Sequence, residues 1–173
     1  DDETQFYYDL DKDENRLSTK TIAAYWTMLA EIPNADKADF LVDHLNNPES
    51  FGTEQPFPTL SVDNPNFSED GNGYCGSVYP AFNFMVIKGL EKYGQYELAR
   101  ECSIRHLYFV LESLMPNNDK EPGDLFEAYL PNKEGCAKIS ADGTMARKRF
   151  LHTTALSTIA LMIENVIGLS ISL

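Results

Sequence analysis

The stretch that most restricts the fold runs from Gly73 to Leu90 and reads GYCGSVYPAFNFMVIKGL. Its first half is a loop rich in Gly and Tyr, whereas its second half is apolar on almost every side. Pro80 stands at the junction, where proline suits the first turn of a helix because an N–H there would lack a partner. Since a helix that is apolar all round is a buried helix, we predict a central helix over residues 80–93, capped by Gly94, with the Gly- and Tyr-rich loop at its mouth.

Apolar residues at helical spacing predict four further helices: residues 19–32, 34–48, 96–115 and 149–166. Pro33, Pro48 and Pro116 mark where three of them end, and Asn34 or Asp36 can cap the second. We therefore expect an all-α domain of antiparallel helical hairpins joined by long loops.

Two features suggest that the chain packs against more protein. The helix over 149–166, like the one over 80–93, is apolar nearly all round, and five helices cannot bury two such helices. The long loop of residues 48–79 is too rich in Phe, Tyr, Leu and Val for disorder, so we expect it to be ordered over a pocket.

The composition restricts the classes of partner that the chain can bind. With 14 basic and 27 acidic side chains the net charge is −13, which argues against nucleic acid as a partner, and no apolar run is long enough to cross a membrane.

The sequence contains no convincing metal site. Cys102 and His106 fall four apart on one predicted helix, where core packing is preferred over a metal site, and we predict no metal and no cofactor. Residues 9–15 resemble the start of a calcium loop, but Glu14 stands where an EF-hand needs Gly, so a polar turn is preferred. The compartment stays open, with a secreted or periplasmic location slightly favoured.

Several segments, in order, resemble the C-terminal half of the (α/α)6-barrel glycoside hydrolases of the clan that holds trehalase and processing α-glucosidase I (family 63). They read FYYDLDKDENRLSTKTIAAYW, FGTEQPFPTLSVDNPNF, GYCGSVYPAFNFMVIKGLEKYG, LFEAYLP and LHTTALSTIALMIENVIGL. The resemblance implies that residues 1–173 form the C-terminal half of one catalytic domain, whose remainder lies upstream or on another chain. It also implies an oligosaccharide substrate.

Glu127 is the candidate catalytic residue. From the residues alone it is either a surface glutamate or, between Phe126 and Tyr129, a carboxyl whose pKa an apolar setting would raise. LFEAYLP resembles the family's WENYNP segment, whose glutamate is the general base of an inverting mechanism on α-glycosidic bonds. Nothing in the chain matches the segment with the family's general acid, so the resemblance places that aspartate outside it. We expect Glu127 to lie partly buried in a concave site, with aromatic neighbours and no Lys or Arg paired with it.

The candidate sugar-binding residues are aromatic: Phe51, Tyr74, Tyr79 and Tyr129. The chain also departs from the family pattern, with Cys75, Ser77, Tyr79, Leu130 and Thr153 where Arg, Pro, Trp, Asn and Trp are usual. Losing an arginine and two tryptophans removes a hydrogen-bonding fork and stacking area. The rival interpretation is therefore a degenerate barrel that binds carbohydrate or acts as a scaffold.

Overall fold

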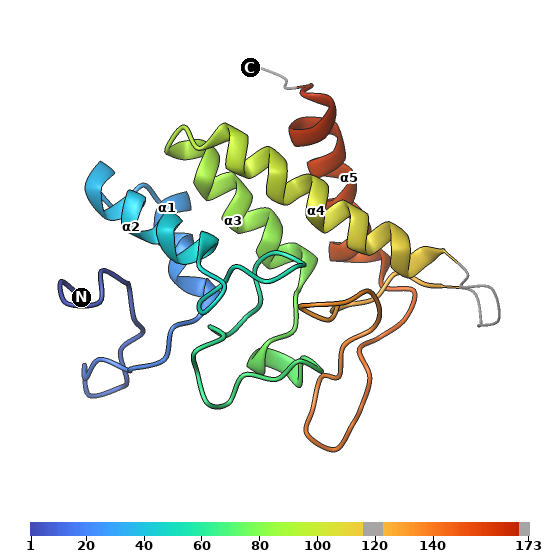
Figure 1. The fold of residues 1–173 in the computed structure, drawn as a ribbon, viewed down its shortest axis with the longest axis horizontal. Helices are drawn as coiled ribbons and strands as arrows, with labels where there is room; N and C mark the ends of the chain where they lie inside the picture. Colours follow the sequence, from blue (N-terminus) through green and yellow to red (C-terminus); the bar gives the residue numbers. More distant parts are fainter. Residues whose placement is uncertain (116–122, 170–173) are drawn as a thin grey trace.

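The structure, a computed structural model, describes residues 1–115 and 123–169 (Figure 1). Within these residues the α-helices are α1 (Trp26–Leu29), α2 (Ala35–Asn46), α3 (Pro80–Lys92), α4 (Tyr96–Leu114) and α5 (Leu156–Leu161). Short 3-10 turns are η1 (Ile22–Tyr25) and η2 (Gly73–Cys75), and π-helical turns η3 (Leu151–Ala155) and η4 (Met162–Ile167) flank α5. The described residues contain only isolated β-bridges and no strand, so the prediction of an all-α fold is confirmed.

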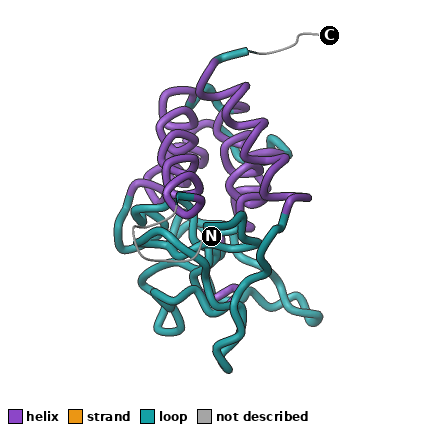
Figure 2. The backbone as a smooth tube through the Cα atoms, turned by 90° about the vertical axis from the view of Figure 1, so that its right-hand side faces the viewer, coloured by secondary structure: helices purple, strands orange, loops and turns teal. Residues whose placement is uncertain are grey.

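Helix α3 is the centre of the helical part, because it packs against α1, α4 and α5. Figures 1 and 2 show the helices on one side of the molecule and the long loops gathered on the other. The main core lies between α1, α2, α3 and α4, and its largest fully buried side chains include Phe6, Ile22, Tyr25, Met28, Leu41, Phe51, Phe57, Ile87 and Leu90.

The starts and ends of α2 and α3 follow from local chemistry. The Asn34 side chain accepts a hydrogen bond from the backbone N–H of Lys37 (3.0 Å) and so caps α2. Pro80 occupies the first turn of α3, and Gly94 follows it with a left-handed φ of +73° that favours glycine. Pro116, which we predicted to end the next helix, lies outside the described residues.

Two predicted helices are shorter than expected, because their first residues bond to loops instead. The backbone N–H of Ile22 donates to Thr59 O (3.1 Å), so residues 19–21 stay extended and only η1 and α1 follow. Phe150 has a non-helical backbone (φ −85°, ψ 78°) and its N–H donates to Leu125 O (3.0 Å), so the last helical segment begins only at Leu151.

Backbone pairing joins the two long loops into one layer, which we call the loop layer (residues 48–79 and 123–150). Val78 and Tyr129 exchange two backbone hydrogen bonds of 2.9 Å each, and Phe126 forms a bridge with Lys148. At Gly73, φ is +66° and a Cβ would lie 2.8 Å from the carbonyl oxygen of Ile139. The chain therefore needs glycine at this close approach of the two loops.

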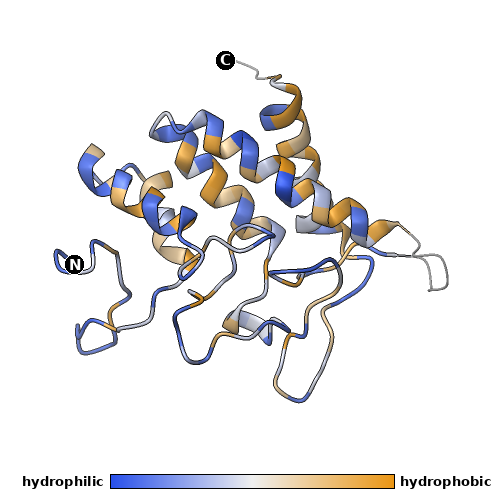
Figure 3. Cartoon of the chain, in the orientation of Figure 1, coloured by the Kyte–Doolittle hydropathy of each residue, from blue (hydrophilic) through white to orange (hydrophobic). Residues whose placement is uncertain are grey.

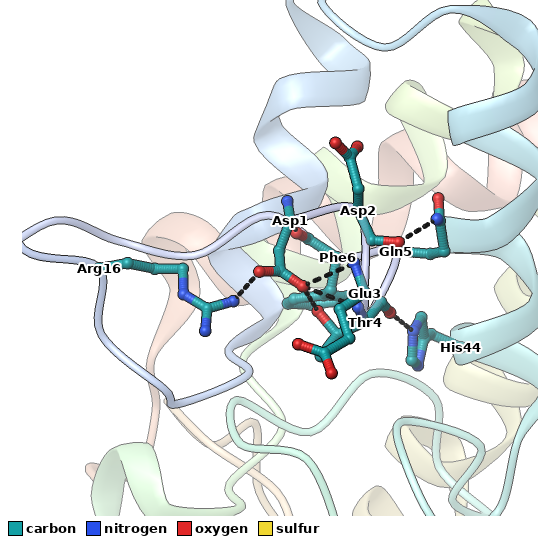
Figure 4. A network of polar contacts seen from close by, with 8 residues as sticks. All are labelled: Asp1, Asp2, Glu3, Thr4, Gln5, Phe6, Arg16 and His44. Carbon is teal, nitrogen blue, oxygen red and sulfur yellow. Dashed lines mark hydrogen bonds and ion pairs between the residues drawn. The ribbon is translucent and has the colours of Figure 1, made fainter.

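The N-terminal segment is held by polar contacts of its own (Figure 4). The Asp1 carboxylate accepts from the backbone N–H of Thr4 (2.7 Å) and pairs with Arg16, while His44 on α2 contacts Thr4 O (3.2 Å). In the turn of residues 10–16 the Asp11 carboxylate accepts two backbone N–H groups of its own turn. This segment is therefore a polar turn, as preferred from the sequence.

Helices α4 and α5 carry many apolar residues, coloured orange in Figure 3, and several of their side chains are exposed. Leu111 is 56% exposed, Ile159 49% and Leu156 70%. A groove of about 500 Å³ runs between α4 and the α5–η4 segment, and a second of about 490 Å³ lies between α3 and α5. Contiguous exposed apolar side chains of this kind mark a surface that packs against other protein. No helix in the described part of the chain has the length and hydropathy needed to cross a membrane.

His106 on α4 is fully buried among polar side chains, and Cys102 one turn earlier is buried as well, so both pack in the core as predicted. The His106 Nδ1 accepts from the side-chain amides of Asn83 (2.9 Å) and Gln55 (3.3 Å). Asn83 also donates to Pro56 O (2.8 Å), so this cluster fastens the loop layer to α3 and α4.

The buried histidine predicts a stability loss in acid. Burial lowers the pKa of His106 from its ordinary 6.5 to about 4, so below pH 6.5 the unfolded chain binds a proton that the folded chain rejects. Stability should therefore fall as the pH drops from about 6.5 to about 4, by about 3 kcal/mol in all from this residue. We expect urea unfolding of the full-length protein to show this loss, and His106→Gln to remove it. His152→Gln, at an exposed histidine, is the control; an unchanged pH dependence in His106→Gln would contradict the assignment.

Candidate functional site

Glu127 lies in the loop layer, on a segment whose neighbours are buried. Phe126 and Ala128 point into the protein at 7% and 0% exposure, whereas the Glu127 side chain reaches the surface and is 17% exposed. The backbone N–H of Glu127 donates to Arg147 O (2.9 Å). This pairing sets residues 127 and 147 opposite each other, although they are 20 positions apart in the chain.

The Glu127 carboxylate forms a two-pronged ion pair with Arg147. Arg147 donates from Nε to Oε2 (2.7 Å) and from Nη2 to Oε1 (2.6 Å), and its guanidinium lies over the ring of Phe150, 4.5 Å from the centroid. The Arg147 hydrogen bonds and charge lower the pKa of Glu127 against a smaller opposing effect of burial. The expectation of a carboxylate without a paired Lys or Arg is therefore wrong, because backbone pairing brings a cation directly opposite.

Four rings form a continuous surface that we call the aromatic strip: Tyr74, Tyr79, Phe82 and Trp26. Tyr74 stacks on Tyr79 with centroids 5.5 Å apart, Phe82 lies 5.5 Å from Tyr79, and Trp26 meets Phe82 edge-on at 5.8 Å. Tyr74 is 69% and Trp26 43% exposed. Burial, followed by smaller effects of Tyr74 and of the Glu127 charge, raises the pKa of Tyr79 to about 12.

The structure places Phe51 and Tyr129 in the interior. Phe51 is fully buried and stacks on Phe6 with centroids 5.9 Å apart. Tyr129 is also fully buried, and its hydroxyl accepts from the backbone N–H of Phe126 (3.1 Å). Contrary to the prediction, neither ring is accessible to a sugar in this arrangement: one fills the core and the other supports the segment that carries Glu127.

Three side chains of this region were not predicted from the sequence: Arg147, which contacts Glu127, and Phe82 and Trp26 of the aromatic strip. Phe82 and Trp26 lie within predicted helices at helical spacing, a pattern that does not separate the rim of a core from its centre. No local pattern identifies Arg147, since only the loop pairing brings it to Glu127. Neither apolar groove has Glu127 among its described lining residues, so the predicted concave site is not formed by those grooves.

The substituted family positions lie around this region. Ser77 is fully buried and its hydroxyl donates to Lys138 O (3.2 Å), tying the two loops together. Thr153 is exposed at the start of the last helical segment, and Cys75 is half-buried beside Tyr74. Among the described residues, no three His, Cys, Asp or Glu side chains gather to hold a metal ion.

The fold resembles solved glycoside hydrolases. GH63 mannosylglycerate hydrolase from Thermus thermophilus, in complex with Tris and D-glycerate, matches 91% of this chain and 34% of its own at 22% identity and a TM-score of 0.70. Neutral trehalase Nth1 from Saccharomyces cerevisiae matches 78% of this chain and 24% of its own at 17% identity and a TM-score of 0.62. Helical hairpins with a shared loop layer thus place the fold with part of an (α/α)6 glycoside hydrolase barrel.

Sequence similarity then gives the family. Residues 1–148 match the mannosylglycerate hydrolase MGH1-like glycoside hydrolase domain, and the chain belongs to this family. A protein of Borreliella burgdorferi is 53% identical over 169 residues, which are 97% of this chain and 35% of that protein. The chain therefore spans about a third of the length of this relative. The predicted resemblance to GH63-like (α/α)6 glycoside hydrolases is confirmed.

Proposed function

We propose that the protein to which this chain contributes is an inverting glycoside hydrolase that acts on α-glycosidic bonds, with Glu127 as its general base. The observation that carries the proposal is the placement of Glu127. Its carboxylate reaches the surface of the loop layer and is 17% exposed, and the backbone pairing of Val78 with Tyr129 holds its segment beside the one that carries Tyr79. A partly buried carboxylate on a segment paired with one that carries aromatic side chains suits the handling of water next to a sugar.

In this mechanism Glu127 accepts a proton from a water as the water oxygen attacks the anomeric carbon. The bond from that carbon to the leaving oxygen breaks, and a second carboxyl on the opposite face gives the leaving oxygen its proton. Inverting pairs stand about 6.5–9.5 Å apart to leave room for the water. We assign the second carboxyl to the part of the domain outside these residues. The aromatic strip would offer its exposed faces to the sugar ring.

The substrate class that we propose is a gluco-oligosaccharide or a related small α-glycoside. Members of the matched family and the Thermus structure carry the name mannosylglycerate hydrolase, so α-mannosylglycerate belongs among the first compounds to test. Trehalose and short α-linked gluco-oligosaccharides complete the set.

The stereochemistry of the product tests the mechanism. Incubated with these compounds, the full-length protein should release from its substrate a sugar that is first detected as the β-anomer in time-resolved proton NMR, because attack from the opposite face inverts an α-linkage. An α-anomer at the attacked carbon would contradict the inverting mechanism. With trehalose, whose second glucose leaves as the α-anomer, inversion gives α- and β-glucose in equal first amounts, and α-glucose alone would be the contradicting result. The free product sugar, followed in the same buffer without protein, gives the rate of spontaneous mutarotation.

The second candidate is a barrel that binds carbohydrate without cleaving it. The ion pair between Glu127 and Arg147 favours this candidate, because a bound cation weakens a carboxylate as a base. Sugar binding by calorimetry, with no release of product from any of the compounds, would support it.

A further inference from the structure

We propose that Arg147 is a positioning residue for Glu127, which holds the carboxylate ionised and in one orientation toward the attacking water. This inference rests on the proposed function of Glu127 as the general base. It assigns a purpose to a contact that would otherwise count against that function.

The planar guanidinium of Arg147 makes two hydrogen bonds to the planar carboxylate of Glu127. Arg147 gives one N–H to each oxygen of Glu127, at 2.7 and 2.6 Å, so the carboxylate cannot rotate without losing a charged hydrogen bond. The backbone bond from Glu127 N to Arg147 O (2.9 Å) fixes the two Cα positions, and the ring of Phe150 supports the guanidinium from one face. These three contacts restrain the Arg147 side chain, although 66% of it is exposed.

The pairing leaves Glu127 able to accept a proton from water. An ionised carboxylate offers about four lone-pair sites over its two oxygens, and the fork takes one on each oxygen. A second site on each oxygen remains for a water. Arginine stays protonated throughout the pH range of proteins, so it does not compete for that proton.

Other charged groups near Glu127 leave Arg147 as its dominant partner. Tyr79, which directly precedes α3, has a pKa of about 12, so its hydroxyl is neutral at ordinary pH. In the same segment Asp124 pairs with Arg149 (Oδ2 to Nε, 3.9 Å), and the charge of Lys148 acts on the Cys136 thiol.

The ion pair should change how the activity depends on pH. A general base works only when deprotonated, and Arg147 lowers the pKa of Glu127, so activity should persist to lower pH than an unpaired carboxylate would allow. Removing the fork raises that pKa and moves the acid limb of kcat/KM to higher pH. Loss of orientation lowers kcat as well, even where Glu127 is fully ionised.

The test uses the full-length protein with the substrate found among the compounds above. We expect Arg147→Gln to move the acid limb to higher pH and to lower the plateau kcat by up to about 100-fold, the scale of a 1 Å misplacement. Arg147→Lys should recover part of the pH shift but little of kcat, because an ammonium is a point charge without a fork. The matched control is Arg149→Gln, which removes a positive charge two residues away and should leave the profile unchanged.

A profile for Arg147→Gln identical to that of the unmodified protein would overturn the proposal, as would a higher plateau kcat, which would make the pair an inhibitory contact. A separate titration of the Glu127 carboxyl by carbon-13 NMR, with Glu127→Gln to identify the signal, needs no turnover. A titration that moves in Arg147→Gln, although no compound is hydrolysed, supports the pairing and counts against the proposed function. A titration that does not move overturns the pairing itself.

Discussion

Replacing Glu127 by glutamine in the full-length protein is expected to lower turnover by about 10²–10⁴-fold, the usual contribution of a general base. Glutamine keeps the size and shape of the side chain but cannot take a proton from water. The rings of the aromatic strip stay in place, so sugar binding measured by calorimetry should survive. Hydrolysis rates and binding constants measured on the same preparation separate the two effects.

The matched control is Glu134→Gln, at an exposed glutamate of the same loop layer, which should leave turnover unchanged. Full hydrolysis by Glu127→Gln would remove Glu127 from the mechanism and leave the carbohydrate-binding scaffold as the better candidate. Loss of binding together with turnover would show that the ion pair with Arg147 holds the loop layer in shape.

Residues 1–173 expressed alone are expected not to form a stable soluble monomer. Helices α4 and α5 present apolar side chains such as Leu111 and Ile159 along a groove of about 500 Å³, and the chain spans about a third of the relative that it matches. Uncovered, such a face associates with itself. Size-exclusion chromatography and binding of a hydrophobic dye would detect this, and a sharp cooperative melt of a soluble monomer would contradict it.

Two substitutions made together can identify the surface that causes the isolated chain to self-associate. Leu111→Gln with Ile159→Gln should reduce dye binding by the isolated chain, because both side chains are exposed there. In the full-length protein the same change should lower stability, since we expect the remainder of the barrel to cover this face. Equal stability of the full-length protein with and without the two changes would show that the face stays open.

The helices were predictable where a local signal fixes them. The Asn34 cap, Pro80 and the left-handed Gly94 act within a few residues of themselves, so α2 and α3 begin and end close to their predicted bounds. The first helix was overestimated because Ile22 bonds to Thr59, a distant partner in the sequence that a local pattern does not contain.

The site was predictable only in part for the same reason. Glu127 and Tyr79 were identified through motifs, but the orientation of a ring in a loop depends on which neighbours bury it. Phe51, Tyr74 and Tyr129 are all aromatic residues of the loop layer, yet Phe51 and Tyr129 are fully buried whereas Tyr74 is 69% exposed. Arg147 reaches Glu127 through pairing between loop segments, which follow no periodic pattern.

The two hydrogen bonds between Val78 and Tyr129 have a mechanical consequence. Val78 directly precedes Tyr79, and Tyr129 lies two residues after Glu127, so the stacking ring and the carboxylate are carried by one paired piece of backbone. The spacing between the place where a sugar would rest and the group that would activate its water is thus built into this chain. In the proposed enzyme these residues would fix one wall of the sugar site, and the remainder of the domain would supply the opposite wall.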